Sequence, residues 1–180
     1  MSKSFAQSRW RFALRLALVH LLINIVVALL VGVLIFGVWY PQPYPDLMGG
    51  FRLLSLIVAV DVVCGPVLTS VFANPQKPKR EMVTDLSIVA VIQLAALAYG
   101  VYTVAQARPV FVTFEADRFV VVSAAEIDRN ELPNALPQFR VLPWRGVQRI
   151  GLRDAVDGNE KLTSLKMSLQ SIKPSVRPGW

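Results

Sequence analysis

The chain has 180 residues, of which 54% are hydrophobic and only 17% charged, and its formal net charge is +7. Soluble domains carry about 25% charged residues, so this composition excludes an ordinary soluble globular domain. The basic residues form short clusters instead of a continuous stripe, which argues against a nucleic-acid partner.

Three long apolar runs account for the composition. They cover about residues 16–40, 53–73 and 85–107, and Asp61 is the only charged residue well inside them. Each run approaches or exceeds the roughly 20 residues that a helix needs to cross about 30 Å of hydrocarbon. We expect three transmembrane helices, because three buried helices of a soluble protein would leave too little polar surface to cover them. The third is expected to begin at Thr84–Asp85, a capping residue followed by an acid.

The first run is expected to remain as an anchor. It extends over 25 residues, which exceeds the roughly 7–15 residues of a signal-peptide core, and no Ala-x-Ala cleavage site follows it.

Basic residues orient the expected helices. They precede the first run and lie between the second and third, whereas residues 41–50 contain no Lys or Arg. Cytoplasmic loops of membrane proteins carry such an excess. We expect a cytoplasmic N-terminus (1–15), a three-helix transmembrane bundle (16–107) and a periplasmic domain (108–180) if the source is bacterial.

Each expected helix carries one strong hydrogen-bonding side chain near mid-depth. Asn24, Asp61 and Gln93 lie roughly 10–12 Å from the relevant helix ends, at about 1.5 Å per residue. Our hypothesis is a polar cluster in which Asp61 accepts hydrogen bonds from the two amides and fixes the register of the bundle. A proton or ion relay through Asp61 is the alternative, although a relay usually needs several ionisable groups.

Gly65–Pro66 follows one turn after Asp61. Proline removes a backbone hydrogen bond and clashes with the carbonyl four residues earlier, so we expect a bend here and a candidate partner contact. Small residues spaced by four, such as Ala28 and Gly32 or Ala96 and Gly100, are typical of closely packed membrane helices.

The tail is expected to form a small α+β domain. Residues 109–114 and 118–123 read as a β-hairpin, and 139–142 and 147–153 as two further strands. Ser123 and Glu126 match a capping box that predicts a short helix. Residues 157–170 predict a helix that Asp157 caps, with Leu162, Leu165 and Leu169 on one face. Residues 173–180 are expected to be a loose end.

No catalytic or metal-binding constellation is recognisable. Cys64 and His20 are the only residues of their types, which leaves neither an intramolecular disulfide nor a zinc-ligand spacing. We expect no enzymatic activity and no cofactor.

Three motifs resemble the TfpX/TfpZ family of type IV pilin accessory proteins. They are "DVVCGPVLT" from Asp61, "QLAALAYG" from Gln93, and "QARPV" from Gln106, followed by "DRF". The resemblance extends from about Trp10 to Asp128. The positions that match its motifs are Asp61, Gly65, Pro66, Gln93, Tyr99, Gly100, Arg108 and Pro109.

The resemblance implies a multi-pass inner-membrane protein of a Gram-negative bacterium that supports type IV pilus assembly or function. The implied partners are the major pilin, the assembly-platform proteins as further candidates, and membrane lipid, with no nucleic acid. Two alternatives stay open, namely a small proton-coupled or transport-associated subunit and an enzyme that modifies pilin.

Overall fold

The computed structural model describes residues 2–115, 118–153, 155–169 and 174–177. The chain separates into two compact units. The first comprises residues 1–35 and 49–104, and the second comprises residues 36–48 and 105–180.

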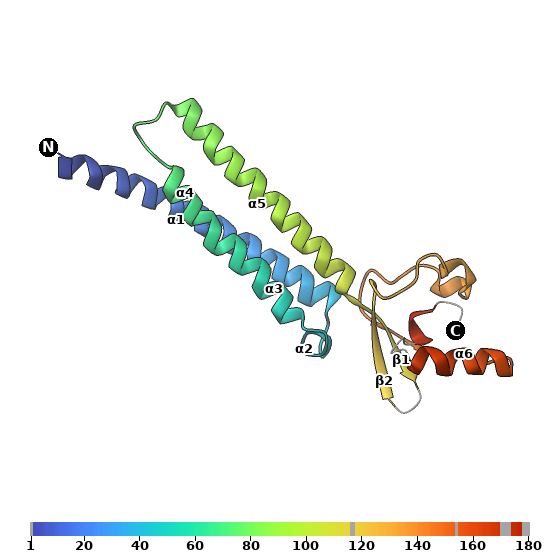
Figure 1. Ribbon diagram of the computed structural model, residues 1–180. Coiled ribbons are helices and arrows are strands. Elements are labelled where there is room, and N and C mark those ends of the chain that lie inside the picture. The colour runs from blue at the N-terminus through green and yellow to red at the C-terminus, as the bar shows by residue number, and fades with distance from the viewer. Residues whose placement is uncertain (1, 116–117, 154, 170–173, 178–180) are drawn as a thin grey trace. The chain divides into compact units, whose positions relative to one another are not determined.

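The first unit consists of long apolar helices (Figure 1). Helix α1 (Ser2–Leu34) leads into the π-helical turn η1 (Ile35–Trp39), and helices α3 (Gly50–Ala59) and α4 (Gly65–Phe72) are joined by a second π-helical turn, η2 (Val60–Cys64). Helix α5 is Lys79–Ala107. Stretches of 31, 23 and 29 residues, at Arg9–Trp39, Gly50–Phe72 and Lys79–Ala107, are long and apolar enough to cross a membrane. The three expected apolar helices are therefore confirmed.

Helix α5 begins earlier than expected. Thr84 does not cap it, because its hydroxyl donates to the carbonyl of Arg80 one turn back, within the helix (3.0 Å). Asp85 instead pairs with Lys77 in the preceding loop, at 2.6 Å. The expectation that the helix starts at Thr84–Asp85 was wrong, since the helix also includes residues 79–83, of which Lys79, Arg80 and Glu81 are charged.

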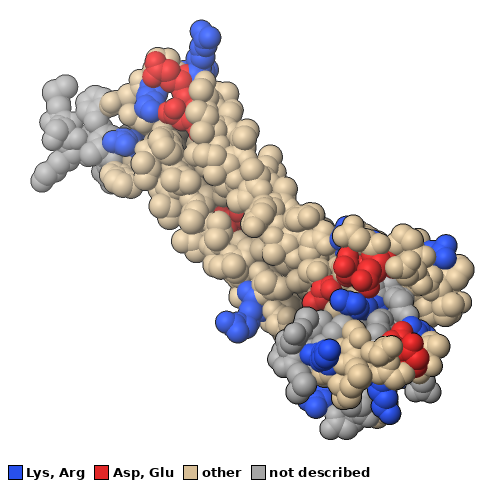
Figure 2. Space-filling model, turned by 45° about the vertical axis from the view of Figure 1, so that its right-hand side comes forward, with Lys and Arg blue, Asp and Glu red and all other residues tan. Residues whose placement is uncertain are grey.

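The helices expose apolar side chains over most of their length. Figure 2 shows uncharged surface along this unit, with charged side chains gathered near the end where α4 joins α5. Val33 and Leu29 of α1, for example, are 71% and 66% exposed. Such a surface needs an apolar environment or partner.

Glycine allows two of the helices to meet closely. A Cβ added to Gly100 of α5 would lie 2.9 Å from the Cγ1 of Ile57 on α3. Gly32 of α1 faces Leu54, where an added Cβ would make an ordinary contact at 3.7 Å. The small-residue spacing noted in the sequence therefore marks a close helix contact at Gly100 and a looser one at Gly32.

A three-stranded sheet forms the centre of the second unit. Strand β1 (Pro109–Glu115) lies between β2 (Arg118–Ser123) and β3 (Gln148–Gly151), antiparallel to β2 and parallel to β3. The hairpin predicted from the alternating pattern is confirmed. Its buried core consists of Val110, Phe111, Val122, Ala124 and Ile127.

Short helical segments make up much of the rest of this unit. They are α2 (Tyr44–Leu47), η3 (Leu132–Asn134), η4 (Pro137–Phe139), α6 (Gly158–Leu169) and η5 (Pro174–Val176). Segment 36–48 belongs to this unit: the N–H of Gly146 donates to the carbonyl of Val38 (3.1 Å), and Trp39 packs edge-on against Trp144.

Two predicted elements of the tail are absent. Residues 139–142 form no strand, because a 3₁₀ turn that starts at Pro137 extends to Phe139. Phe139 and Leu142 pack against the core. Ser123 and Glu126 do form a hydrogen-bonded pair (2.8 Å from the Ser123 N–H), but residues 124–126 form a turn and no helix. The N–H groups of Ala124 and Ala125 bind the carbonyls of Arg108 and Gln106, which holds the turn against the end of α5.

The C-terminal segment also departs from expectation. Asp157 caps α6 as predicted, accepting from the N–H of Glu160 (2.7 Å). Leu162 and Leu165 on its face are 57% and 55% exposed, while the side chain of Leu169 lies outside the described residues. Residues 174–177 are ordered by the buried Ser175, whose hydroxyl donates to Glu115 (3.1 Å), whereas the rest of the predicted loose end, 173 and 178–180, lies outside the described residues.

Acidification is expected to loosen the start of α6. Arg153 donates to both carboxylate oxygens of Glu160 and the N–H of Val156 to one, and these contacts lower the pKa of Glu160 from 4.5 to about 2. Because the folded pKa is depressed, the stabilisation is complete above about pH 4.5 and is lost as the pH falls towards 2. NMR titration of the Glu160 carboxyl group and amide exchange in α6, corrected for intrinsic rates, measure this.

Glu160→Gln provides the control. In this variant the corrected exchange of α6 is expected to be independent of pH over the same range. A pH response that survives the substitution would assign it to another group.

Candidate functional site

The turn η2 leaves one main-chain carbonyl without its helical donor. In a π-helix the donor to a carbonyl is the N–H five residues later. For Asp61 that residue is Pro66, which has no N–H. A π-helical turn therefore lies just before the proline, where the sequence predicts a bend.

Asn24 and Gln93 supply the missing donors. The side-chain amide of Asn24 donates to the carbonyl oxygen of Asp61 at 2.6 Å, and that of Gln93 donates to the same oxygen at 3.3 Å. The structure therefore brings together the three residues of the hypothesised cluster, from α1, η2 and α5. The acceptor, however, is the main-chain carbonyl of Asp61 and not its carboxylate.

Gly65 completes this arrangement, which we call the polar junction (Asn24, Asp61, Gly65, Gln93). An added Cβ on Gly65 would lie 2.7 Å from the Nδ2 of Asn24 and closer still to the amide of Gln93. Only glycine therefore allows both amides to reach the Asp61 carbonyl. The side chains of Asn24 and Gln93 therefore fill the space beside Gly65.

The sequence analysis did not predict a second contact between helices. The Nδ1 of His20 and the hydroxyl of Thr69 lie in hydrogen-bond contact at 2.5 Å. The signal was available: His20 and Asn24 are four residues apart, as are Asp61, Gly65 and Thr69. Residues four apart share a helix face, so the polar positions of the two helices form facing rows.

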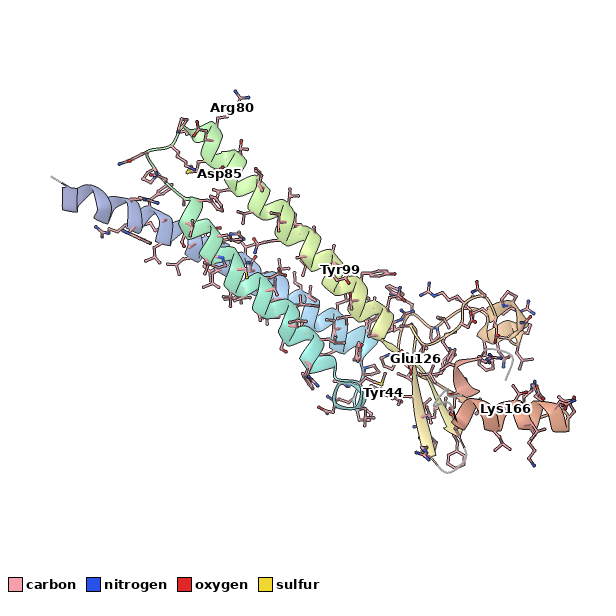
Figure 3. The ribbon with its side chains drawn as sticks, in the orientation of Figure 1. Tyr44, Arg80, Asp85, Tyr99, Glu126 and Lys166 are labelled. Atoms are coloured by element: carbon pink, nitrogen blue, oxygen red, sulfur yellow. The ribbon has the colours of Figure 1, made fainter. Side chains whose placement is uncertain are left out.

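Asp61 also borders a groove on another side of η2. This lateral groove has a volume of about 250 Å³ and lies between α3 and α5, lined mainly by Leu56, Ile57, Val60, Ala96, Tyr99 and Gly100. Tyr99 is 72% exposed and projects from α5 (Figure 3). Two motif positions, Tyr99 and Gly100, thus belong to an apolar groove with one acidic residue.

Arg108 organises the second unit immediately after α5. Its guanidinium donates to the carbonyls of Ala105 (2.5 Å) and Pro143 (3.4 Å) and lies 5.0 Å from the ring centre of Trp144. Trp144 in turn packs edge-on against Trp39, with ring centres 5.5 Å apart. Burial lowers the pKa of Arg108, and Arg129 adds a smaller effect in the same direction. Arg108 and the fully buried Pro109 are therefore internal residues of this unit.

A second groove lies beside the sheet. It has a volume of about 470 Å³, with an apolar floor that includes Phe111 and Ile150 and three arginines among its lining residues, Arg140, Arg153 and Arg177. Arg153 pairs with Glu160, and Arg177 lies 3.9 Å from Glu131. No local sequence pattern predicted this groove, because its lining comes from five separate segments.

The described residues contain no group of three or more His, Cys, Asp or Glu side chains that could hold a metal ion. The amides of Asn24 and Gln93 in the first unit and the guanidinium of Arg108 in the second donate to main-chain carbonyls of the chain itself.

Comparison with known proteins gives consistent relatives. A family model described as fimbrial assembly protein FimB matches residues 8–49. The chain is 41% identical to the fimbrial assembly protein of serogroup I from Dichelobacter nodosus over 172 residues, 96% of this chain and 67% of the relative. It is 45% identical to the fimbrial assembly protein of serogroups C1 and C2 of that species over 129 residues, 72% of this chain and 98% of the relative. No solved structure matches the chain.

Gly65→Ala is expected to destabilise the first unit by about 1–3 kcal/mol, because the new methyl group overpacks the polar junction. Thermal unfolding in detergent measures the loss. Gly37→Ala is the matched control, since no atom lies within 4 Å of an added Cβ there. If both variants unfold at the same temperature, the close approach at Gly65 is not tight. Adding Gln93→Ala to Gly65→Ala should recover part of the loss, because it removes one of the colliding amides.

Arg108→Lys is expected to destabilise the second unit by about 2 kcal/mol despite the retained charge. A lysine cannot bind two carbonyls and stack on Trp144 at once. Tryptophan fluorescence during denaturant unfolding reports the loss. Arg145→Lys, at an exposed arginine next to Trp144, should leave the midpoint unchanged. Equal midpoints for the two variants would show that the Arg108 contacts contribute little.

Proposed function

The chain belongs to the family of fimbrial assembly proteins, and we propose that it is an inner-membrane accessory protein that supports type IV pilus assembly by contacting the pilin subunit. The 41% identity to a fimbrial assembly protein across 96% of the chain is the observation that carries the proposal.

The architecture supports a membrane location. Three helices are long and apolar enough to span a bilayer, and their large side chains are widely exposed. Basic residues lie in the N-terminal part of α1, before its apolar run, and in the α4–α5 loop and first turn of α5, and such clusters are typical of cytoplasmic segments. We infer a cytoplasmic N-terminus and a periplasmic second unit, with membrane lipid around the helices.

This topology suits a subunit that waits in the membrane before assembly. A pilin has an apolar helix and a periplasmic head, so a protein with both a helical unit and a periplasmic unit can contact both parts. The second unit offers exposed apolar side chains for this purpose, including Phe119 at 73% and Trp144 at 61% exposure. The assembly-platform proteins are further candidate partners.

The proton-coupled alternative has less support. The acidic residues within the three candidate spans are Asp61, Glu81 and Asp85. Only Asp61 lies far from a helix end. His20 is in contact with Thr69. A relay normally uses a row of ionisable groups, whereas the polar groups here tie helices together.

Deleting the gene is expected to remove most surface pili while the pilin itself is still made. Electron microscopy and immunoblotting of sheared pili and of total pilin measure the two quantities, and the full chain supplied in trans should restore piliation. Normal piliation in the deletion strain would contradict the proposed function. An altered pilin mass would favour a modifying enzyme, and a lost proton or solute flux with normal pili would favour the transport alternative.

A further inference from the structure

The lateral groove is shaped for an extended apolar object. On α3 and η2 it runs from Leu53 to Asp61, and on α5 from Ala96 to Val104. Eight residues of helix rise about 12 Å, so each wall covers rather more than two helical turns. A second helix laid along these walls would contact both.

The groove has a small-residue floor on α5. Ala96 and Gly100 are four residues apart and both line it. Small residues at this spacing let another helix approach closely in an apolar phase. A larger side chain at Ala96 would occupy the volume that a partner helix needs, whereas Gly100 also allows the close contact with Ile57 of α3.

Asp61 gives the groove a chemical preference. The residue is 9% exposed, so nine-tenths of it is buried. Its carbonyl binds Asn24 and Gln93, but among the described residues its carboxyl group has no hydrogen bond or ion pair. An acidic residue that is largely buried among apolar side chains and whose carboxyl group has no partner is costly, so the groove is complementary to a helix that brings a hydrogen-bond donor to this depth.

We propose that the lateral groove receives an apolar helix of the membrane-anchored fimbrial subunit, and that a hydrogen-bond donor of that helix pairs with the carboxyl group of Asp61. This inference rests on the proposed function and locates its contact. It places the partner on the α3–α5 side of η2, because the chain's own amides already occupy the face at Gly65.

Photo-crosslinking in cells tests the location. A photoreactive residue replaces Leu56, which lines the groove, or Leu94, which lies on α5 outside it; both side chains are 65% exposed. The host is the deletion strain carrying the otherwise complete chain. We expect an adduct with the fimbrial subunit from position 56 and little or none from position 94.

Two pairs of substitutions, each combined with the photoreactive residue at position 56, test what the groove recognises. Ala96→Leu fills the groove and should abolish the adduct, whereas Ala98→Leu, at an exposed alanine outside it, should not. Asp61→Leu should lower the yield about threefold, the value of an average interhelical hydrogen bond in a membrane. Asp61→Asn keeps an accepting oxygen, so its adduct yield should lie between that of the chain with Asp61 and that of Asp61→Leu. Immunoblotting confirms that each variant accumulates.

Several outcomes would overturn the inference. They are equal adducts from positions 56 and 94, adducts mainly with a second copy of this chain, or adducts with lipid alone. These outcomes are judged from the chain that carries only the photoreactive residue, so they can be measured even if a substituted variant fails to accumulate. If the deletion strain lacks pili while any of these holds, the groove assignment fails and the proposed function stands; if the deletion strain makes normal pili, the function itself fails.

Discussion

The missing amide hydrogen of Pro66 is the constraint on which the helical unit depends. Away from water, a main-chain carbonyl without a donor is costly, and the π-helical turn η2 leaves the Asp61 carbonyl in that position. Asn24 and Gln93 come from two other helices to satisfy it, at 2.6 and 3.3 Å. Gly65 has no side chain because both amides must pass it. One backbone defect therefore specifies which residues of α1, η2 and α5 meet, and so the register of the three helices.

This role of polar groups agrees with the lipid surroundings that we propose for the helices. Their outer surfaces are apolar, as Val33 and Leu29 show, and in lipid the hydrophobic effect does not distinguish one apolar face from another. Hydrogen bonds such as those at the polar junction, and between His20 and Thr69, supply the missing specificity. Asp61 then acts in two directions: its carbonyl orders the chain's own helices, and its carboxyl group marks the proposed recognition groove.

The second unit is organised by a charge instead. Arg108 directly follows the last residue of α5. Its guanidinium donates to two carbonyls and lies over the ring of Trp144. Trp39 reaches the same cluster from the segment that follows α1. Burial raises the pKa of the adjacent Tyr40 to about 12, so this residue stays neutral and adds no second charge to the interior. A small core beside the central strand β1 completes the unit.

The sequence by itself determined the features that depend on local composition and period: three apolar helices, the β1–β2 hairpin and the Asp157 cap. It also placed Asn24, Asp61 and Gln93 at one depth, because helical rise is constant. It did not reveal that the acceptor is the Asp61 carbonyl, nor that Thr69 meets His20. It wrongly made residues 139–142 a strand and started the third helix at Thr84. Only the tertiary structure decided the parallel pairing of β3 with β1, the inclusion of residues 36–48 in the second unit and the lateral groove, because each arises where segments distant in the chain meet and no local pattern encodes which partner a segment will find.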